Sequence, residues 1–348
     1  SGNSGGGIYN SGTLTMNNST LSGNSNVGSS GGISNNGTVT VNNSTLSGNS
    51  AYFTGGGIRN FGTVTINNST LSGNSALAGY GGGITNGGTT GILTVNNSTL
   101  SGNSAGTNGG GIFNNGTLTV SNSTLNGNSA GSGGGIFNGS GSFPLATLNR
   151  SLISGNSAPN GAEIFKSGGV INGNNYNVIG YDGSDRSDGF IPGPNDFIPP
   201  GPLDTVLDTT LADNGGPTLT HALVSGSVAI DAAPSDACLA PPINGIDQRG
   251  FPRNVDGDGS PSADECDAGA FEFAPRVRPT KTPTPTGMPQ STRTPTPRPT
   301  RTPAPLELNQ GISSTTGSAD ESAQPLARLL VVTLLALGNL LLFRKWRM

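Results

Sequence analysis

Acidic residues, histidine and lysine are missing from residues 1–162, where Arg59 and Arg150 carry the only charges. Enzymes that cleave polysaccharides need carboxylates as acids, bases or metal ligands. Residues 1–162 hold no such group, so we expect no cleavage of polysaccharide there. Aromatic residues make up only 5% of the chain and charged residues only 10%. This composition is typical of disorder unless a repeat supplies order.

Residues 1–162 contain a sequence repeat. The stretch GGGIYNSGTLTMNNSTLSGNS, residues 5–25, recurs with little change. A period near 25 residues is typical of a solenoid, in which a single unit cannot bury its apolar face alone. The isoleucine of the repeat returns every 24–28 residues, at Ile8, Ile33, Ile58, Ile84, Ile112, Ile136 and Ile164.

Each repeat predicts three short strands and no helix. Residues 13–17 alternate polar and apolar side chains, which is the pattern of a strand with one buried face. Leu21 marks a second strand and Ile8 a third, while Asn, Gly and Ser form the corners. We therefore expect an all-β fold, a right-handed parallel β-helix of seven coils over residues 1–168 with about 25 residues per coil. Its inward side chains should be Ile8, Leu14, Met16, Leu21 and their counterparts in each coil.

Asparagine recurs at two corners of the repeat. Stacked amides can form a hydrogen-bonded ladder, and Asn tolerates the left-handed conformation that tight corners need. The NNST blocks also match the N-glycosylation pattern. We prefer the ladder because it accounts for the repetition. The two sets are Asn18, Asn43, Asn68, Asn97 and Asn122, and Asn24, Asn49, Asn74, Asn103, Asn128 and Asn156.

The residue after each GGGI isoleucine should point outward and form an exposed strip along the coils. Its aromatic side chains gather toward the C-terminal end. Such a strip could bind sugar rings or a partner, and packing between neighbouring strands is the alternative. Insertions after SGNS in several repeats could add a second binding face. The candidate binding residues are Tyr9, Arg59, Phe113, Phe137 and Phe165.

Most acidic side chains of the chain lie in residues 169–274, which we expect to form an acidic capping domain. Residues 1–274 hold seventeen acidic and six basic side chains, a net charge of −11. Nucleic-acid binding is therefore not expected. Several blocks stand out in this part: DNGGPTLTHAL, GSVAID, DQRGFPR and CDAGAFE.

Together these blocks resemble the bacterial choice-of-anchor Q domain over about residues 170–274. The coils resemble the repeats of polymorphic outer-membrane proteins in architecture. The first resemblance implies a secreted protein displayed at the cell surface, and it implies no enzymatic activity.

The two cysteines of the chain, Cys238 and Cys266, lie in this segment. In an exported protein such a pair predicts a disulfide, whereas zinc would need more than the lone His221. An acidic stretch nearby is similar to a calcium loop, with Pro and Asp where Gly and Glu are usual, and a solvated acidic loop is the alternative. The candidate Ca²⁺ ligands are Asp256, Asp258, Ser260, Asp264 and Asp267.

The two ends of the chain predict export and anchoring. It opens on SGNS, the tail of a repeat, with no signal peptide before it, so we expect further sequence upstream. Residues 275–325 are rich in Pro and Thr and should form a disordered, extended linker. Residues 326–348 combine an apolar run with a basic end and predict a transmembrane helix with the coils outside the cell.

These features predict a non-enzymatic cell-surface protein of a structural or adhesin-like kind. Its partners would be the membrane and, through the coils, surface glycans or other cells. A carbohydrate-active enzyme is an alternative that the missing carboxylates disfavour. Ice binding is another, because outward Thr pairs recur at Thr13 and Thr15, Thr38 and Thr40, Thr63 and Thr65, and Thr117 and Thr119.

Overall fold

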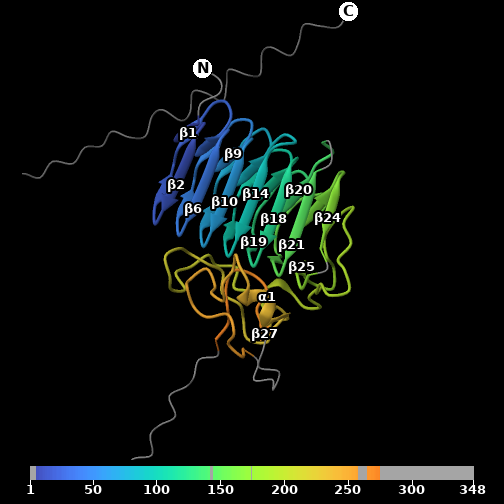
Figure 1. The fold of residues 1–348 in the computed structure, drawn as a ribbon. Coiled ribbons are helices and arrows are strands. Elements are labelled where there is room, and N and C mark those ends of the chain that lie inside the picture. Colours follow the sequence, from blue (N-terminus) through green and yellow to red (C-terminus); the bar gives the residue numbers. More distant parts are fainter. Residues whose placement is uncertain (1–4, 142–143, 174, 258–264, 275–348) are drawn as a thin grey trace, which may run out of the picture. The chain divides into compact units, whose positions relative to one another are not determined.

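The computed structural model describes residues 5–141, 144–173, 175–257 and 265–274. These residues all fall within one compact unit, residues 1–280. Figure 1 shows the coils stacked in chain order, from blue to green. The fold is an all-β, right-handed parallel solenoid of about seven turns, as the repeat predicts.

Three seven-stranded parallel sheets run along the coils. The first sheet contains β1 (Ile8–Asn10), β5 (Ile33–Asn35), β9 (Ile58–Asn60), β13 (Ile84–Asn86), β17 (Ile112–Asn114), β20 (Ile136–Asn138) and β23 (Ile164–Lys166). The second sheet contains β2 (Thr13–Asn17), β6 (Thr38–Asn42), β10 (Thr63–Asn67), β14 (Ile92–Asn96), β18 (Thr117–Ser121), β21 (Leu145–Asn149) and β24 (Val170–Asn172). The third sheet contains β3 (Thr20–Ser22), β7 (Thr45–Ser47), β11 (Thr70–Ser72), β15 (Thr99–Ser101), β19 (Thr124–Asn126), β22 (Leu152–Ile153) and β25 (Val178–Ile179).

The prediction of three strands per coil is incomplete, because four coils carry a fourth strand. It begins at the serine that ends SGNS, where backbone groups of neighbouring coils pair before the chain turns into the insertion. These strands form a four-stranded sheet of β4 (Ser25–Asn26), β8 (Ser50–Ala51), β12 (Ser75–Ala76) and β16 (Ser104–Ala105).

Equivalent residues of successive coils pair in register, so each apolar position becomes a column in the core. Ile8 pairs with Ile33 and Leu14 with Val39. The counterparts of Ile8, Leu14, Met16 and Leu21 form one continuous buried cluster, which confirms the predicted inward set. The first-coil residues Ile8, Leu14 and Leu21 are partly buried.

The corners follow from local backbone chemistry. Asn18 and its counterparts at 43, 68, 97 and 122 have φ between 44° and 48°, which Asn tolerates better than most residues. The GGGI glycines serve close packing instead. A Cβ on Gly82 would lie 2.3 Å from the carbonyl oxygen of Ser104, so a side chain there would collide with backbone.

A ladder of buried amides lies along one of the predicted corners. We call Asn24, Asn49, Asn74, Asn103, Asn128 and Asn156 the interior Asn ladder. Each Nδ2 donates to the Oδ1 of the next coil, at 2.8–3.0 Å. The last amide, Asn156, donates to Glu163 Oε2 at 2.6 Å. Since a ladder of donors must end on an acceptor, the first acidic residue of the chain closes it.

A second buried ladder was not predicted. In the first sheet, the Nδ2 of each Asn donates to the Oδ1 of the next coil at 2.8 Å. These amides also donate to the carbonyls that lead into the second sheet. The ladder therefore joins two sheets across a corner. Its members are Asn10, Asn35, Asn60, Asn86, Asn114 and Asn138.

The part of the chain that follows the predicted coils divides into two segments with different positions. Residues 175–197 continue the stack, where Val178 pairs with Leu152 and Phe190 packs against the core. Residues 203–257 and 265–274, the flanking segment, do not cap the end of the stack but lie along the outside of the third sheet (Figure 1, yellow to orange). The segment contains η1 (Leu203–Thr205), β26 (Ala233–Pro234), α1 (Ser235–Leu239) and β27 (Glu265–Cys266). The predicted boundary between two domains at residue 168 stays a prediction.

Candidate functional site

The threonine positions on the outer face of the second sheet stay at least partly open to solvent. Equivalent threonines pair in register in six consecutive strands and form an uninterrupted column. All of them are exposed or half-buried. We call this set the Thr column: Thr15, Thr40, Thr65, Thr94, Thr119 and Thr147. A parallel outer column is less regular, because Ile92 and Leu145 replace threonine there.

A row of amides borders the Thr column on the same face. Asn42 Nδ2 donates to Asn17 Oδ1 at 2.8 Å, Asn67 to Asn42 at 2.9 Å, and Asn96 to Asn67 at 3.0 Å. The row and the Thr column carry no charged side chain. The arrangement is a regular, uncharged lattice of hydroxyls and amides, repeated at the coil spacing of about 4.8 Å. Such a surface can form many hydrogen bonds with a neutral, repetitive partner.

The predicted aromatic strip exists as a column, but two of its phenylalanines are buried and not exposed as predicted. Tyr9 and its counterparts pair in register in the first sheet. Tyr9 is 52% exposed, whereas Phe113 is 9% and Phe137 8% exposed. Arg59 and Phe165 are half-buried.

Stacking between coils explains why the phenylalanines are buried. The rings of Phe113 and Phe137 stack with centroids 5.3 Å apart, and those of Phe137 and Phe165 stack at 5.2 Å. Tyr80, which lies in a corner insertion, packs against Phe113 with the ring centroids 4.9 Å apart. Each ring thus covers the face of its neighbour. These three phenylalanines therefore fit the alternative interpretation of the strip, in which its side chains pack between neighbouring strands.

The sequence blocks of the flanking segment contact successive coils of the third sheet. Thr70 Oγ1 donates to the carbonyl of Leu219 at 2.6 Å, and Thr99 Oγ1 donates to Gln248 Oε1 at 2.7 Å. The amide of Ala270 donates to Thr124 Oγ1 at 3.0 Å. Residues in or next to the NGGPT, DQRG and CDAGAFE blocks therefore join the flanking segment to coils three to five through hydrogen bonds.

His221 also joins the flanking segment to the coils. Its Nε2 lies 2.9 Å from Ser101 Oγ, and its Nδ1 lies 2.9 Å from the carbonyl oxygen of Asp208. Because that carbonyl can only accept, Nδ1 carries the proton and Nε2 accepts from the serine. Burial lowers the pKa of His221, which favours this neutral form. Ser101 and His221 are both buried, so this pair joins the segment to the coil.

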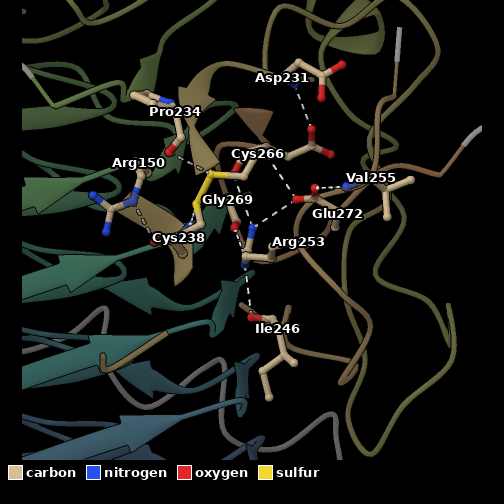
Figure 2. Close-up of a disulfide and its surroundings, with 12 residues drawn as sticks. Arg150, Asp231, Pro234, Cys238, Ile246, Arg253, Val255, Cys266, Gly269 and Glu272 are labelled. Atoms are coloured by element: carbon tan, nitrogen blue, oxygen red, sulfur yellow. Dashed lines mark hydrogen bonds and ion pairs between the residues drawn. A yellow bond between two sulfur atoms is a disulfide. The ribbon is translucent and has the colours of Figure 1, made fainter. Parts of the chain in front are cut away.

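A buried ion cluster lies beside the disulfide (Figure 2). The fully buried guanidinium of Arg253 donates to the carbonyls of Gly269 at 2.7 Å and Ile246 at 3.1 Å, and lies 3.5 Å from Glu272. Arg253 Nη2 also donates to Asn97 Oδ1 of the coils at 3.0 Å. Burial raises the pKa of Glu272 to about 7, against the lowering effect of Arg253. The cluster thus ties the segment both to itself and to the solenoid.

The disulfide between Cys238 and Cys266 is present, as predicted. It closes a loop of 28 residues, which on the chain-entropy argument contributes about 3–4 kcal/mol. The same loop contains most of the predicted calcium ligands.

The predicted calcium loop is only partly described. Asp258, Ser260 and Asp264 lie outside the described residues. Asp267 is buried, and its two oxygens accept the backbone N–H groups of Asp231, at 2.8 Å, and Phe273. Asp256 is exposed. Within the described residues no group of three or more potential metal ligands gathers. Calcium binding stays a prediction, and Asp267 has a structural role within the segment.

Glu163 predicts a dependence of stability on pH. Burial raises its pKa to about 8, although N–H donors from Asn156 and Gly155 lower it. The folded pKa lies above the unfolded value near 4.5, so the folded state holds a proton that the unfolded state loses. The contribution of Glu163 to stability should therefore fall between about pH 4.5 and pH 8. We expect Glu163→Gln to flatten this decline in melting temperature, followed by circular dichroism.

The comparison between wild type and Glu163→Gln isolates this residue. Asp267 and Glu272 also have raised pKa values and act in the same direction, whereas His221 acts in the opposite one. These groups are unchanged in the variant. Parallel pH profiles for the two proteins would contradict the assignment.

No helix in the described part of the chain is long and apolar enough to cross a membrane. The predicted linker, residues 275–325, and the predicted transmembrane helix, residues 326–348, lie outside the described residues. No protein-family model matches the chain, and neither a curated protein nor a solved structure matches it. The resemblance to choice-of-anchor Q proteins therefore rests on the sequence blocks alone.

Proposed function

We propose that this protein is a non-enzymatic attachment protein that uses the outer face of the second sheet. The observation that carries the proposal is the uninterrupted Thr column beside the amide row. Six coils repeat one uncharged hydrogen-bonding pattern, and this favours a partner that is itself neutral and repetitive, such as a surface polysaccharide. The proposal does not rely on the aromatic strip, because two of its phenylalanines are buried.

Three buried acidic residues, Glu163, Asp247 and Glu272, are poorly placed for catalysis. Both oxygens of Glu163 accept hydrogen bonds at the end of the interior Asn ladder. Asp247 pairs with Arg249 at 2.6 Å, and Glu272 lies in the buried cluster with Arg253. A general acid or base must reach its substrate, and these carboxylates face the interior.

Attachment is tested by adding charge to the Thr column. We expect Thr94→Lys with Thr119→Lys to reduce at least tenfold the adhesion of beads that carry the full chain to surfaces coated with neutral polysaccharide. The matched control is Thr89→Lys with Thr209→Lys, which adds the same charge at exposed loop positions. Equal adhesion of the two variants would contradict the proposal. Release of reducing ends by the wild-type chain would contradict its non-enzymatic part.

Ice binding is the second candidate. The in-register threonines of the second sheet form a regular array of hydroxyls, and the Thr column is longer than the sequence indicated because Thr94 and Thr147 belong to it. Thermal hysteresis of the wild-type chain, lost in Thr94→Lys with Thr119→Lys, would establish ice as the partner. No thermal hysteresis would exclude it.

Display at the cell surface is part of the same proposal. The Pro- and Thr-rich residues 275–325 would act as a spacer and the apolar residues 326–348 as a membrane anchor. Fractionation of cells expressing the chain with and without residues 326–348 tests this. Membrane association of the shortened chain would contradict the anchor.

A further inference from the structure

A groove lies where the amide row of the second sheet meets the flanking segment. It has a volume of about 730 Å³, within the range of small-ligand sites. Unlike most such sites it is lined by amides and contains no charged side chain. We call it the amide groove, and its lining includes Asn42, Asn67, Asn68, Asn96, Pro242 and Asn244.

Two acceptors in this lining have no partner among the described residues. The Oδ1 atoms of Asn68 and Asn96 are buried and accept no hydrogen bond, and Asn96 as a whole is 2% exposed. Leaving a buried acceptor without a hydrogen bond destabilises the fold. A ligand that supplies hydrogen-bond donors to the groove would offset this cost.

Asn96 Oδ1 is unpaired because the repeat changes in the following coil. In the amide row each Nδ2 donates to the Oδ1 of the preceding coil, so Asn96 Oδ1 needs a donor from the following coil. The residue in register there is Ser121 instead of asparagine. The row is therefore interrupted beside the loop that carries Pro242 and Asn244. The interruption leaves Asn96 Oδ1 unpaired beside the groove.

The chemistry of the lining identifies the ligand class. Acceptors need donors, which excludes an anion as the main ligand. A cation would be left without a counter-charge, because no carboxylate lines the groove. Hydroxyl groups both donate and accept, and amide side chains complement them in both roles. The columns of Asn17, Asn42 and Asn67 and of Asn18, Asn43 and Asn68 repeat at about 4.8 Å, close to the length of one sugar ring.

We propose that the amide groove binds a linear neutral glycan, whose hydroxyls exchange hydrogen bonds with the amides of the lining, Asn68 and Asn96 among them, and whose successive rings follow the coils. This inference builds on the proposed attachment function and assigns a ligand class and a site to it. Affinity should rise with chain length until the columns are filled.

The test uses the full chain and an array of neutral and anionic glycans, followed by titration with oligosaccharides of increasing length from the strongest neutral series. We expect binding to linear neutral glycans, and a loss of at least tenfold in Asn96→Leu. The matched control, Asn149→Leu, changes the amide row outside the groove and should bind as wild type. Wild-type binding to no neutral glycan, or an equal loss in the control, would overturn the proposal.

Ser121→Asn gives an independent measurement. The new amide would donate to Asn96 Oδ1 and complete the row, so it should raise the melting temperature while weakening glycan binding. A variant that gains stability and keeps full affinity would contradict the role of Asn96. Because none of these positions belongs to the Thr column, loss of the groove and loss of attachment through the column give different results.

Discussion

Replacing Arg253 by methionine is expected to lower the free energy of unfolding by about 3–5 kcal/mol. The side chain is fully buried, and its Nε and Nη atoms donate to Ile246, Gly269 and Asn97. Methionine fills similar volume but leaves these acceptors unpaired and removes the charge opposite Glu272. Breaking a buried ion pair from one side is costly because the remaining charge has no partner.

The pH dependence of this loss distinguishes charge from packing. Burial already raises the pKa of Glu272 to about 7, and without Arg253 its pKa should rise further. A protonated Glu272 needs no counter-charge, so the deficit of Arg253→Met should shrink as pH falls below 7. Chemical denaturation at pH 5 and pH 8 measures both values. The control is Arg186→Met, an exposed arginine stacked on Tyr181, where the loss should stay below about 1 kcal/mol.

Arg253 also shows what the sequence could not predict. The coils are predictable because a 25-residue period and alternating side chains together determine the strands, the register and the inward columns. The contacts of the flanking segment join residues about 150 positions apart, such as Thr99 and Gln248. Each such contact occurs once, so no periodicity reveals it. The DQRG block is therefore visible in the sequence as a motif, but the sequence does not predict its position along the third sheet.

The aromatic strip was predicted in register but not in exposure, for a physical reason. Alternation along a strand shows that Phe113 and Phe137 leave the core on the outer face. It does not show that parallel stacking brings identical rings about 5 Å apart, where each ring covers the next. Identical aromatic residues in consecutive coils should therefore be expected to pack against one another.

Two unpredicted polar features have a signal in the sequence. Asparagine recurs two residues after each GGGI isoleucine, from Asn10 to Asn138, and these amides form the unpredicted ladder of the first sheet. GGGI becomes GAEI at Glu163, which marks the coil where the interior Asn ladder ends. The amide groove had no such signal, because Pro242 and Asn244 come from outside the repeat.

The interior Asn ladder leads to the second large effect: Asn103→Ala should lower the free energy of unfolding by about 2–5 kcal/mol. Asn103 Oδ1 accepts from the backbone N and from Nδ2 of Asn74, and its Nδ2 donates to the carbonyl of Leu71 and to Asn128 Oδ1. All of these groups are buried. Alanine removes four hydrogen bonds at once and leaves buried groups without partners on both neighbouring coils.

Position along the solenoid decides how costly such a change is. Asn17→Ala, at an exposed end of the amide row, removes a single hydrogen bond where water can replace it, and should cost less than about 1 kcal/mol. Urea denaturation of wild type and both variants measures the difference. Similar losses at the two positions would mean that the interior Asn ladder contributes no more than surface amides. A larger loss at Asn103 would show that buried amides hold the coils together where the chain has almost no charge.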